Sequence, residues 1–287
     1  LTPTYGLVSR WGLIDYANSL DKIGPIAKTV YDAALLLSVI SGYDKRDSTS
    51  TKRDKIDYVQ YIGKECKNFK VGIPKEYFSL QVDTAIKKQV FALIDKLRSE
   101  GIECEETSLP LTEVAIPTYY IISMSEASTN LAKFSGLRYG LQKPFEGGVQ
   151  DYFTKIRTEG FGEEAKRRII LGTFMRMAGY REKYYLKALK IRRKIINEFK
   201  QAFQKYDLLI APSMPILPPK FSEIKALTPA QTYSMDILTV APNLAGMPTI
   251  SIPFGKVSGL PIGVQLIADH FNEGKLIEMG SFIEKLG

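Results

Sequence analysis

Two serine–lysine pairs are the most visible candidates for nucleophilic chemistry in this chain. Ser19 precedes Lys22 by three residues, and Ser222 precedes Lys225 by the same spacing. Some serine acylases use this Ser-x-x-Lys arrangement, in which the lysine activates the serine hydroxyl. The pattern also arises by chance in a chain this rich in serine and lysine. Because one pair lies in irregular chain and the other in a polar loop beside prolines, neither is a convincing nucleophile.

Histidine and cysteine chemistry is limited by how few of these residues occur. The chain has one histidine, His270, and two cysteines, Cys66 and Cys104. This set is too small for a zinc site of the usual type, so no metal site is predicted. A Ser-His-Asp triad would need His270, which lies in the polar segment ADHFNEG and is expected to be a solvated loop residue. The cysteines are expected to be free thiols, as in a reducing compartment.

The composition is that of an ordinary globular protein. Of the 287 residues, 45% are apolar and 24% are charged, which allows one large domain or two small ones. No apolar run is long enough to cross a bilayer, and the N-terminal LTPTYGLVSR lacks the basic-then-apolar layout of a signal peptide. The sequence therefore predicts a cytoplasmic protein without a membrane partner.

The net charge of +8 favours an anionic partner such as nucleic acid. Most of the excess lies in a predicted helix over residues 181–205. Four lysines on one face of this helix are spaced 4, 3 and 4 residues apart: Lys183, Lys187, Lys190 and Lys194. This face is interpreted either as solvated lysines or as a stripe that tracks RNA phosphates. The solvated face is favoured, because no aromatic residue interleaves the lysines.

Hydrophobic periodicity and turn residues predict an α/β fold with a mixed sheet flanked by helices. A strand at 69–73, a helix at 82–101 and an edge strand at 102–106 read as a parallel βαβ unit. Further strands are expected at 206–212, 249–252 and 262–268. Further helices are expected at 30–40, 118–134, 181–205, 236–244 and 275–286, with two or three shorter ones between residues 151 and 180. The segment at about 111–205 is thus a helical insertion between strands.

Individual residues are expected to fix these elements. Thr29 caps the first helix. The helix at 82–101 is expected to bury Ile86, Val90, Leu93 and Leu97. The helix at 181–205 is expected to bury Tyr185, Leu189, Ile196, Phe199 and Phe203, with Arg192 interrupting the stripe. Pro253 and Gly255 are expected to end the strand that starts at Thr249, which makes the last two strands a hairpin or meander at the heart of the sheet.

The exact residues of the C-terminal strands are more informative than their alternation of polar and apolar positions. The segment NLAGMPTISIPFG, followed by GLPIGVQLIA, resembles the C-terminal signature of the amidase signature family. The segments LTPTYGLVSR, SLDKIGP, SEASTNLAKFSGLRYG and RRIILGTF resemble the branch of this family formed by tRNA-dependent amidotransferase subunits. The resemblance covers essentially the whole chain, including its linkers.

The resemblance implies a mechanism and also a missing part. The family hydrolyses amides with a Ser–cis-Ser–Lys triad, whose residues lie in segments of the form GGSSGGS and GSDTGGSIRxP. Neither form occurs here, and the only Gly-Gly pair is Gly147-Gly148. We therefore expect residues 1–287 to be the C-terminal portion of a single amidase-signature domain. Without its N-terminal part the chain should be inactive alone and should self-associate through exposed apolar surface.

The resemblance also implies an amide-substrate pocket. Glutamine carries an α-carboxylate and an α-ammonium, and the family binds the first through an arginine and the second through an aspartate. Arg168, preferred over Arg167, matches that arginine, and Asp236 matches the aspartate, although Pro242 falls one position late. Tyr119 or its neighbour Tyr120 matches a substrate-binding tyrosine.

Each of these residues has a structural alternative. Arg167 and Arg168 could flank a helix, Asp236 could be a helix N-terminal carboxylate, and the tyrosines could be core residues. Three further residues match the family's sequence pattern, but no role is assigned to them: Glu126, Asn130 and Arg138.

The resemblance further implies a glutaminase subunit that supplies ammonia for converting misacylated Glu-tRNA(Gln), or Asp-tRNA(Asn), to the amidated form. Its expected partners are the amidotransferase B and C subunits and, through the complex, the tRNA. This subunit should need no cofactor, while ATP and Mg are expected at a partner. Two alternatives remain: another amidase-signature hydrolase, or a non-catalytic module that binds tRNA or protein.

Overall fold

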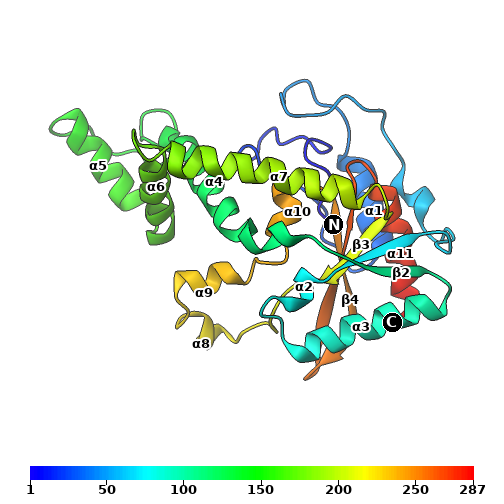
Figure 1. The fold of residues 1–287 in the computed structure, drawn as a ribbon. Helices are drawn as coiled ribbons and strands as arrows, with labels where there is room; N and C mark the ends of the chain where they lie inside the picture. The colour runs from blue at the N-terminus through cyan, green and yellow to red at the C-terminus, as the bar shows by residue number, and fades with distance from the viewer. The chain divides into compact units, whose positions relative to one another are not determined.

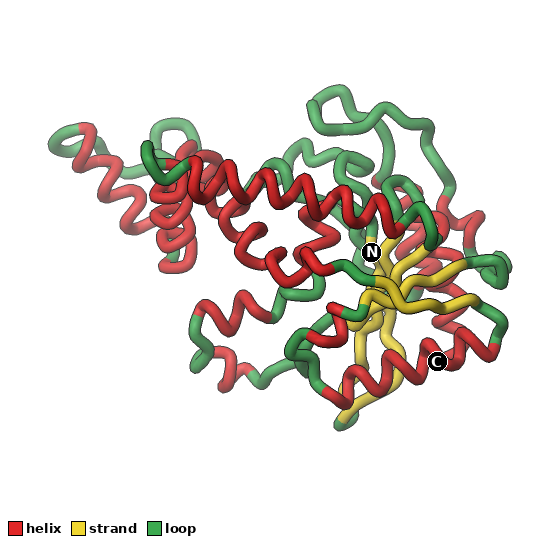
Figure 2. The backbone as a smooth tube through the Cα atoms, in the orientation of Figure 1, coloured by secondary structure: helices red, strands yellow, loops and turns green.

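The computed structural model describes all residues from 1 to 287, which divide into two compact units. The first, here called the sheet unit, comprises Leu1–Trp11, Lys22–Ile116 and Arg192–Gly287. The second, the helical unit, comprises Gly12–Asp21 and Pro117–Ile191. All the strands belong to the sheet unit, as the ribbon and tube views show (Figures 1 and 2). None of the helices combines the length and apolar character that crossing a membrane requires.

The sheet unit is built on one mixed sheet of five strands. They are β1 (Lys70–Pro74), β2 (Glu103–Thr107), β3 (Leu208–Pro212), β4 (Thr249–Val257) and β5 (Leu260–Ala268). Their spatial order is β2-β1-β3-β5-β4. β1 pairs in parallel with β2 and β3, whereas β5 pairs antiparallel with β3 and β4. The mixed sheet, its parallel βαβ unit and the edge position of β2 are therefore confirmed.

The C-terminal hairpin differs from the prediction in two ways. β4 lies at the edge of the sheet rather than at its heart, and Pro253 does not end it. An edge strand tolerates proline, because one of its sides needs no ladder donor. The strand continues through a bulge that contains Gly255, with φ of 69°. The hairpin itself closes at Ser258 and Gly259, whose φ values of 51° and 79° suit a tight two-residue turn.

The helices of the sheet unit cover the sheet and fill its connections. They are α1 (Val30–Ile40), α2 (Glu76–Ser79), α3 (Thr84–Ser99), α8 (Phe221–Ile224), α9 (Pro229–Ser234), α10 (Val240–Ala245) and α11 (Glu273–Leu286), with 3₁₀ turns η1 (Tyr58–Tyr61) and η2 (Pro110–Val114). α3 packs against the sheet, and α11 packs against β4, β5 and α1. The buried stripe of α3 is the predicted one, and the Thr29 hydroxyl accepts a hydrogen bond from the Asp32 amide at 3.0 Å. α8 lies in the polar stretch beside prolines, around Ser222 and Lys225, where a loop was expected.

The helical unit contains α5 (Val149–Gly160), α6 (Glu163–Arg176), the 3₁₀ turn η3 (Leu131–Lys133) and the π-helical turn η4 (Glu182–Leu186). α4 (Ala115–Asn130) and α7 (Lys187–Ala202) each have residues in both units. The single helix predicted over 181–205 is thus divided, because the Leu186 amide bonds to the Arg181 carbonyl at 3.0 Å, five residues back.

The buried stripe of α7 also differs from the prediction. The buried residues are Ala188, Ile195, Phe199 and Ala202. Of the predicted set only Phe199 is fully buried, and the others are half-buried. Arg192 interrupts the stripe as predicted, and its Nε donates to the Leu244 carbonyl at 2.8 Å.

Candidate substrate-binding site

Arg168, in the helical unit, is held by hydrogen bonds and by contacts with aromatic rings. It lies on α6, one turn after Glu164, so both side chains share a helix face. Its Nε donates to Glu164 Oε1 at 2.7 Å, and its Nη1 donates to the Tyr16 hydroxyl at 3.0 Å. The guanidinium also lies over the rings of Tyr16 and Tyr120, 5.4 and 5.9 Å from their centroids. These contacts fix the plane of the fork.

The electrostatics of this position keep the guanidinium charged. Burial opposes the charged form of Arg168, but the hydrogen bonds and charges of Glu164 and Tyr16 outweigh it and raise its pKa above the ordinary value. A permanently charged, planar group with a fixed orientation is suited to binding a carboxylate. Arg167, by contrast, is exposed and pairs with Glu164 alone, at the surface.

The two candidate tyrosines occupy different positions around Arg168. Tyr120 is buried and provides the ring beneath the guanidinium, whereas Tyr119 is half-buried. Their rings pack edge to face with centroids 5.1 Å apart. Tyr120 therefore packs against the guanidinium of Arg168, and Tyr119 packs against Tyr120.

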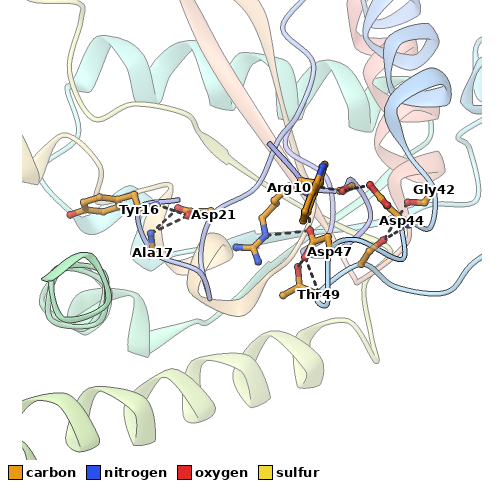
Figure 3. Close-up of polar contacts among 11 residues, drawn as sticks. Arg10, Tyr16, Ala17, Asp21, Gly42, Asp44, Asp47 and Thr49 are labelled. Atoms are coloured by element: carbon orange, nitrogen blue, oxygen red, sulfur yellow. Dashed lines mark hydrogen bonds and ion pairs between the residues drawn. The ribbon is translucent and has the colours of Figure 1, made fainter. Parts of the chain in front are cut away.

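The irregular segment 12–21 brings Tyr16 to this arginine. Asp21 accepts hydrogen bonds from the Tyr16 and Ala17 amides at 2.9 and 3.0 Å, which closes a tight loop (Figure 3). Asn130 on α4 donates to the Tyr16 carbonyl at 3.0 Å. Glu126, also on α4, accepts from the Ser19 amide at 2.9 Å and from its hydroxyl at 2.6 Å. Glu126 and Asn130 thus have a role that the sequence did not reveal, since they hold this loop.

A glycine allows α4 and α6 to approach each other closely. A β-carbon added to Gly172 would lie 1.9 Å from the Met124 carbonyl oxygen, so no larger residue fits there. The same helices carry Tyr120, Glu126, Asn130 and Arg168. Their spacing, and with it the geometry around the arginine, depends on this contact.

Asp236 lies in the other unit, in the turn that precedes α10. It is half-buried, and its carbonyl accepts from the Thr239 and Val240 amides at 2.9 and 3.1 Å. The helix predicted to start at Asp236 in fact starts at Val240. The aspartate therefore lies four residues before the helix and is not simply its N-terminal carboxylate. The structure brings together Arg168, Tyr16 and the tyrosine pair within one unit, and Asp236 belongs to the sheet unit.

The Gly246–Pro248 break after α10 is held from several sides. Gly246 has φ of 74°, as the predicted helix end requires. Its carbonyl accepts from the Tyr5 amide at 3.1 Å, and Lys22 Nζ donates to the Met247 carbonyl at 2.9 Å. His270 Nε2 lies 3.0 Å from the Ala245 carbonyl, so this histidine is half-buried and bonded rather than a solvated loop residue.

Neither Ser-x-x-Lys pair forms a catalytic arrangement. The Ser19 hydroxyl bonds to Glu126, and Lys22 bonds to a backbone carbonyl. Burial lowers the pKa of Lys22 to about 7, against the opposing charge of Glu273. Ser222 and Lys225 are both exposed, at α8. Both cysteines are free thiols, and no group of three or more His, Cys, Asp or Glu side chains is placed to hold a metal ion.

A second polar network shapes the sheet unit near Arg10. Asp47 accepts from the Arg10 amide at 2.7 Å and from the Thr49 amide at 2.9 Å, and Asp44 accepts from the Ser9 hydroxyl at 2.9 Å (Figure 3). These carboxylates anchor the charged segment 44–54 to residues 9–10.

The fold and these motifs are those of the amidase family. Residues 1–277 match the amidase family, and the chain belongs to it. It is 50% identical over 287 residues to a glutamyl-tRNA(Gln) amidotransferase A subunit (number 2) of Clostridium acetobutylicum, a match that covers 99% of this chain and 60% of that relative. It is 46% identical over 286 residues to the glutamyl-tRNA(Gln) amidotransferase A subunit of Halothermothrix orenii, again covering 99% and 60%.

A solved structure supports the same grouping. The glutamyl-tRNA(Gln) amidotransferase A subunit of Thermotoga maritima superposes with a TM-score of 0.77 at 38% identity, covering 96% of this chain and 55% of that one. The present chain thus spans about 60% of the length of the curated relatives it matches. The resemblance stated from the sequence is confirmed, and so is the amidase-signature fold.

Two contacts were not predicted from the sequence, although Lys22 itself was considered there as part of a Ser-x-x-Lys pair. Tyr16 contacts Arg168 through both its hydroxyl and its ring, and Lys22 grips the Gly246–Pro248 break. Both lie in the irregular N-terminal stretch, which has no period to show which side chains point inward. The only available signal was the general tendency of such loops to line sites.

Proposed function

We propose that this chain is part of the glutamine-hydrolysing A subunit of a tRNA-dependent amidotransferase. The complex would convert misacylated Glu-tRNA(Gln) to Gln-tRNA(Gln), or Asp-tRNA(Asn) to Asn-tRNA(Asn). The observation that carries the proposal is the continuous 50% identity to such a subunit over 99% of the chain. The charged, orientated arginine of the helical unit supports a substrate with a carboxylate.

The proposal gives each candidate residue a task. Arg168, orientated by Glu164 and Tyr16, would pair with the α-carboxylate of glutamine. Asp236 would pair with the α-ammonium, and Tyr119 would contact the bound amino acid. The nucleophilic serine, the bridging serine and the lysine are assigned to residues outside these 287, because no Gly/Ser-rich segment of the family's form occurs among them.

The proposed partners follow from the same assignment. They are the B and C subunits of the amidotransferase and, through the complex, the misacylated tRNA. The A subunit would need no cofactor, while ATP and Mg would act at a partner. The proposed setting is the cytoplasm, where aminoacyl-tRNA is made and used.

Substrate analogues test the proposed pocket. The gene's complete product, co-expressed with the B and C subunits, is assayed for ammonia release from three amides: glutamine, 4-aminobutanamide (no carboxylate) and glutaramic acid (no ammonium). We expect kcat/KM to fall at least about 100-fold for each analogue, since a site built to pair with both charged groups of the substrate rejects an analogue that leaves one of its own groups unpaired. Comparable rates for all three amides would favour the alternative, a general amide hydrolase.

A further inference from the structure

Three aromatic rings gather on the exposed surface where α6 ends and α7 begins. Phe174 lies 4.4 Å from Tyr180 and 5.9 Å from Tyr184, measured between ring centroids, and the two tyrosines are 6.3 Å apart. The three side chains are 39%, 40% and 38% exposed, in that order. Rings that pack on one another yet keep more than a third of their surface open offer flat apolar faces to a partner.

Four cations lie beside and after these rings in the sequence. Arg181, Lys183, Lys187 and Lys190 are all exposed, and none makes an ion pair or a side-chain hydrogen bond. Glu182 is the only acidic residue between positions 174 and 190. We call the three rings and these four cations the aromatic–basic surface. All seven residues belong to the helical unit.

The exposed rings beside the lysine face favour a binding role for that face over plain solvation. Solvated lysines were favoured on the ground that no aromatic residue interleaves them, but Tyr184 and Tyr185 lie between Lys183 and Lys187 in the sequence. In the structure the rings lie between the end of α6 and the start of α7, at the N-terminal end of the lysine row, and Tyr184 shares the turn η4 with Lys183. A solvated face has no reason to keep three clustered rings exposed.

The chemistry of the surface selects one class of partner. Protein interfaces are depleted of lysine in their cores. Nucleic-acid strands instead combine bases, which stack on aromatic rings, with phosphates, which attract exposed lysines and arginines. A duplex would hide its base faces, so the rings fit unpaired nucleotides.

We propose that the aromatic–basic surface binds unpaired nucleotides of the tRNA substrate, with Tyr180 and Tyr184 stacking on bases and the four cations contacting phosphates. The inference rests on the proposed function, since that function supplies the tRNA. It adds an RNA contact made by this chain, separate from the glutamine pocket.

Affinity measured against salt tests the two halves of the surface separately. The gene's complete product, in complex with the B and C subunits, is titrated with the cognate tRNA between about 50 and 300 mM KCl. Tyr180→Ala/Tyr184→Ala should weaken binding about 10- to 100-fold with little change in the salt slope. Lys183→Gln/Lys187→Gln should reduce the slope of log K against log [salt] by about 1.4, because each lost single-strand contact removes about 0.7.

Matched variants separate stacking and phosphate contact from general effects. Lys67→Gln/Lys225→Gln removes two exposed lysines elsewhere and should leave the slope unchanged. Tyr180→Phe/Tyr184→Phe keeps the rings and should retain affinity. Glutamine hydrolysis without tRNA should be unchanged in every variant, which shows that the protein is folded.

The outcomes are decisive in either direction. If the tyrosine and lysine variants behave like the Lys67/Lys225 control while wild type binds and amidates tRNA, the surface proposal is wrong and the proposed function stands. The surface proposal is also wrong if the variants weaken only the association with the B or C subunits, which would make this a protein interface. If the wild-type complex neither binds nor amidates tRNA, both proposals fail together.

Discussion

An arginine that recognises a carboxylate has to stay charged and keep its plane fixed. Arg168 meets both conditions, because Glu164 and Tyr16 hold two of its nitrogens and two aromatic rings flank its guanidinium. Its neighbour Arg167 has none of this support beyond the surface pair with Glu164. The contrast between adjacent residues of one helix provides a matched control.

Replacing Arg168 should weaken glutamine binding more than it slows chemistry. Arg168→Lys keeps the charge but loses the planar fork, so KM for glutamine should rise about 10- to 100-fold, the equivalent of one charge-assisted hydrogen bond of about 1.5–3 kcal/mol. kcat should change little, because the α-carboxylate contact is the same in the ground and transition states. Steady-state glutaminase kinetics of the complete complex measure this. Arg167→Lys should leave KM within about twofold, and an equal effect of both substitutions would contradict the role of Arg168.

Lys22 should make stability depend on pH. Burial lowers its pKa in the folded chain from an ordinary value near 10.5 to about 7, so between these values the unfolded chain binds more protons. Stability from this group is therefore greatest above pH 10.5 and is lost as pH falls toward 7. Melting temperatures of wild type and Lys22→Met, compared from pH 7 to 10, test this: the variant's advantage should be largest at pH 7 and shrink as pH rises. A difference that does not vary with pH would show that Lys22 does not titrate in this range.

At the scale of single residues, the sequence indicated which residues are candidates for the site but not which residues contact them. Arg168 and the tyrosine pair were named as candidates because their segments resemble the family's sequence pattern. Tyr16, Glu126 and Asn130 form the support around Arg168 through pairings more than 100 positions apart. No local pattern encodes such pairings, so only the folded chain reveals them.

At the scale of helices and strands, the geometry around Arg168 depends on the close contact between α4 and α6. Gly172→Ala would push a methyl group into the Met124 carbonyl, since the added atom would lie 1.9 Å from that oxygen. The helices would have to separate, at a cost of about 1–3 kcal/mol or more. Faster hydrogen exchange in α4 and α6 and a lower melting temperature should report it.

Gly160→Ala is the matched control for this prediction. It lies at the end of α5, and its added β-carbon would meet Leu141 at an ordinary 3.7 Å. Alanine in a helix is favoured over glycine, so this variant should be neutral or slightly stabilised. An equal loss in both variants would show that the α4–α6 contact is not special.

The elements themselves were largely predictable, with exceptions that have physical causes. The stripe of α3 and the Thr29 cap follow from local periodicity and hydrogen bonding, and both are observed. β4 runs past Pro253 because it is an edge strand, a property of the whole sheet that a local reading cannot supply. The π-helical turn before α7 is likewise absent from any 3.6-residue pattern.

For the molecule as a whole, the outer face of α1 stands out. Tyr31, Leu35 and Val39, spaced four residues apart, are 48%, 45% and 65% exposed. An apolar helical stripe of this kind normally packs against further protein. We expect the 287-residue chain by itself to associate in a concentration-dependent way, as measured by sedimentation velocity. Tyr31→Glu/Val39→Glu should reduce the association, and a monomer at all concentrations without any substitution would contradict this expectation.

We propose above that this chain belongs to a protein that supplies ammonia from glutamine for the amidation of misacylated tRNA. The most direct test uses the gene's complete product with the B and C subunits, ATP, Mg²⁺, ¹⁵N-amide glutamine and misacylated tRNA, either Glu-tRNA(Gln) or Asp-tRNA(Asn). Label from glutamine should appear in the amide of one aminoacyl-tRNA, and Arg168→Lys should reduce its transfer at low glutamine while added ammonium restores amidation. Hydrolysis of glutamine or another amide with no label in either tRNA would contradict the account.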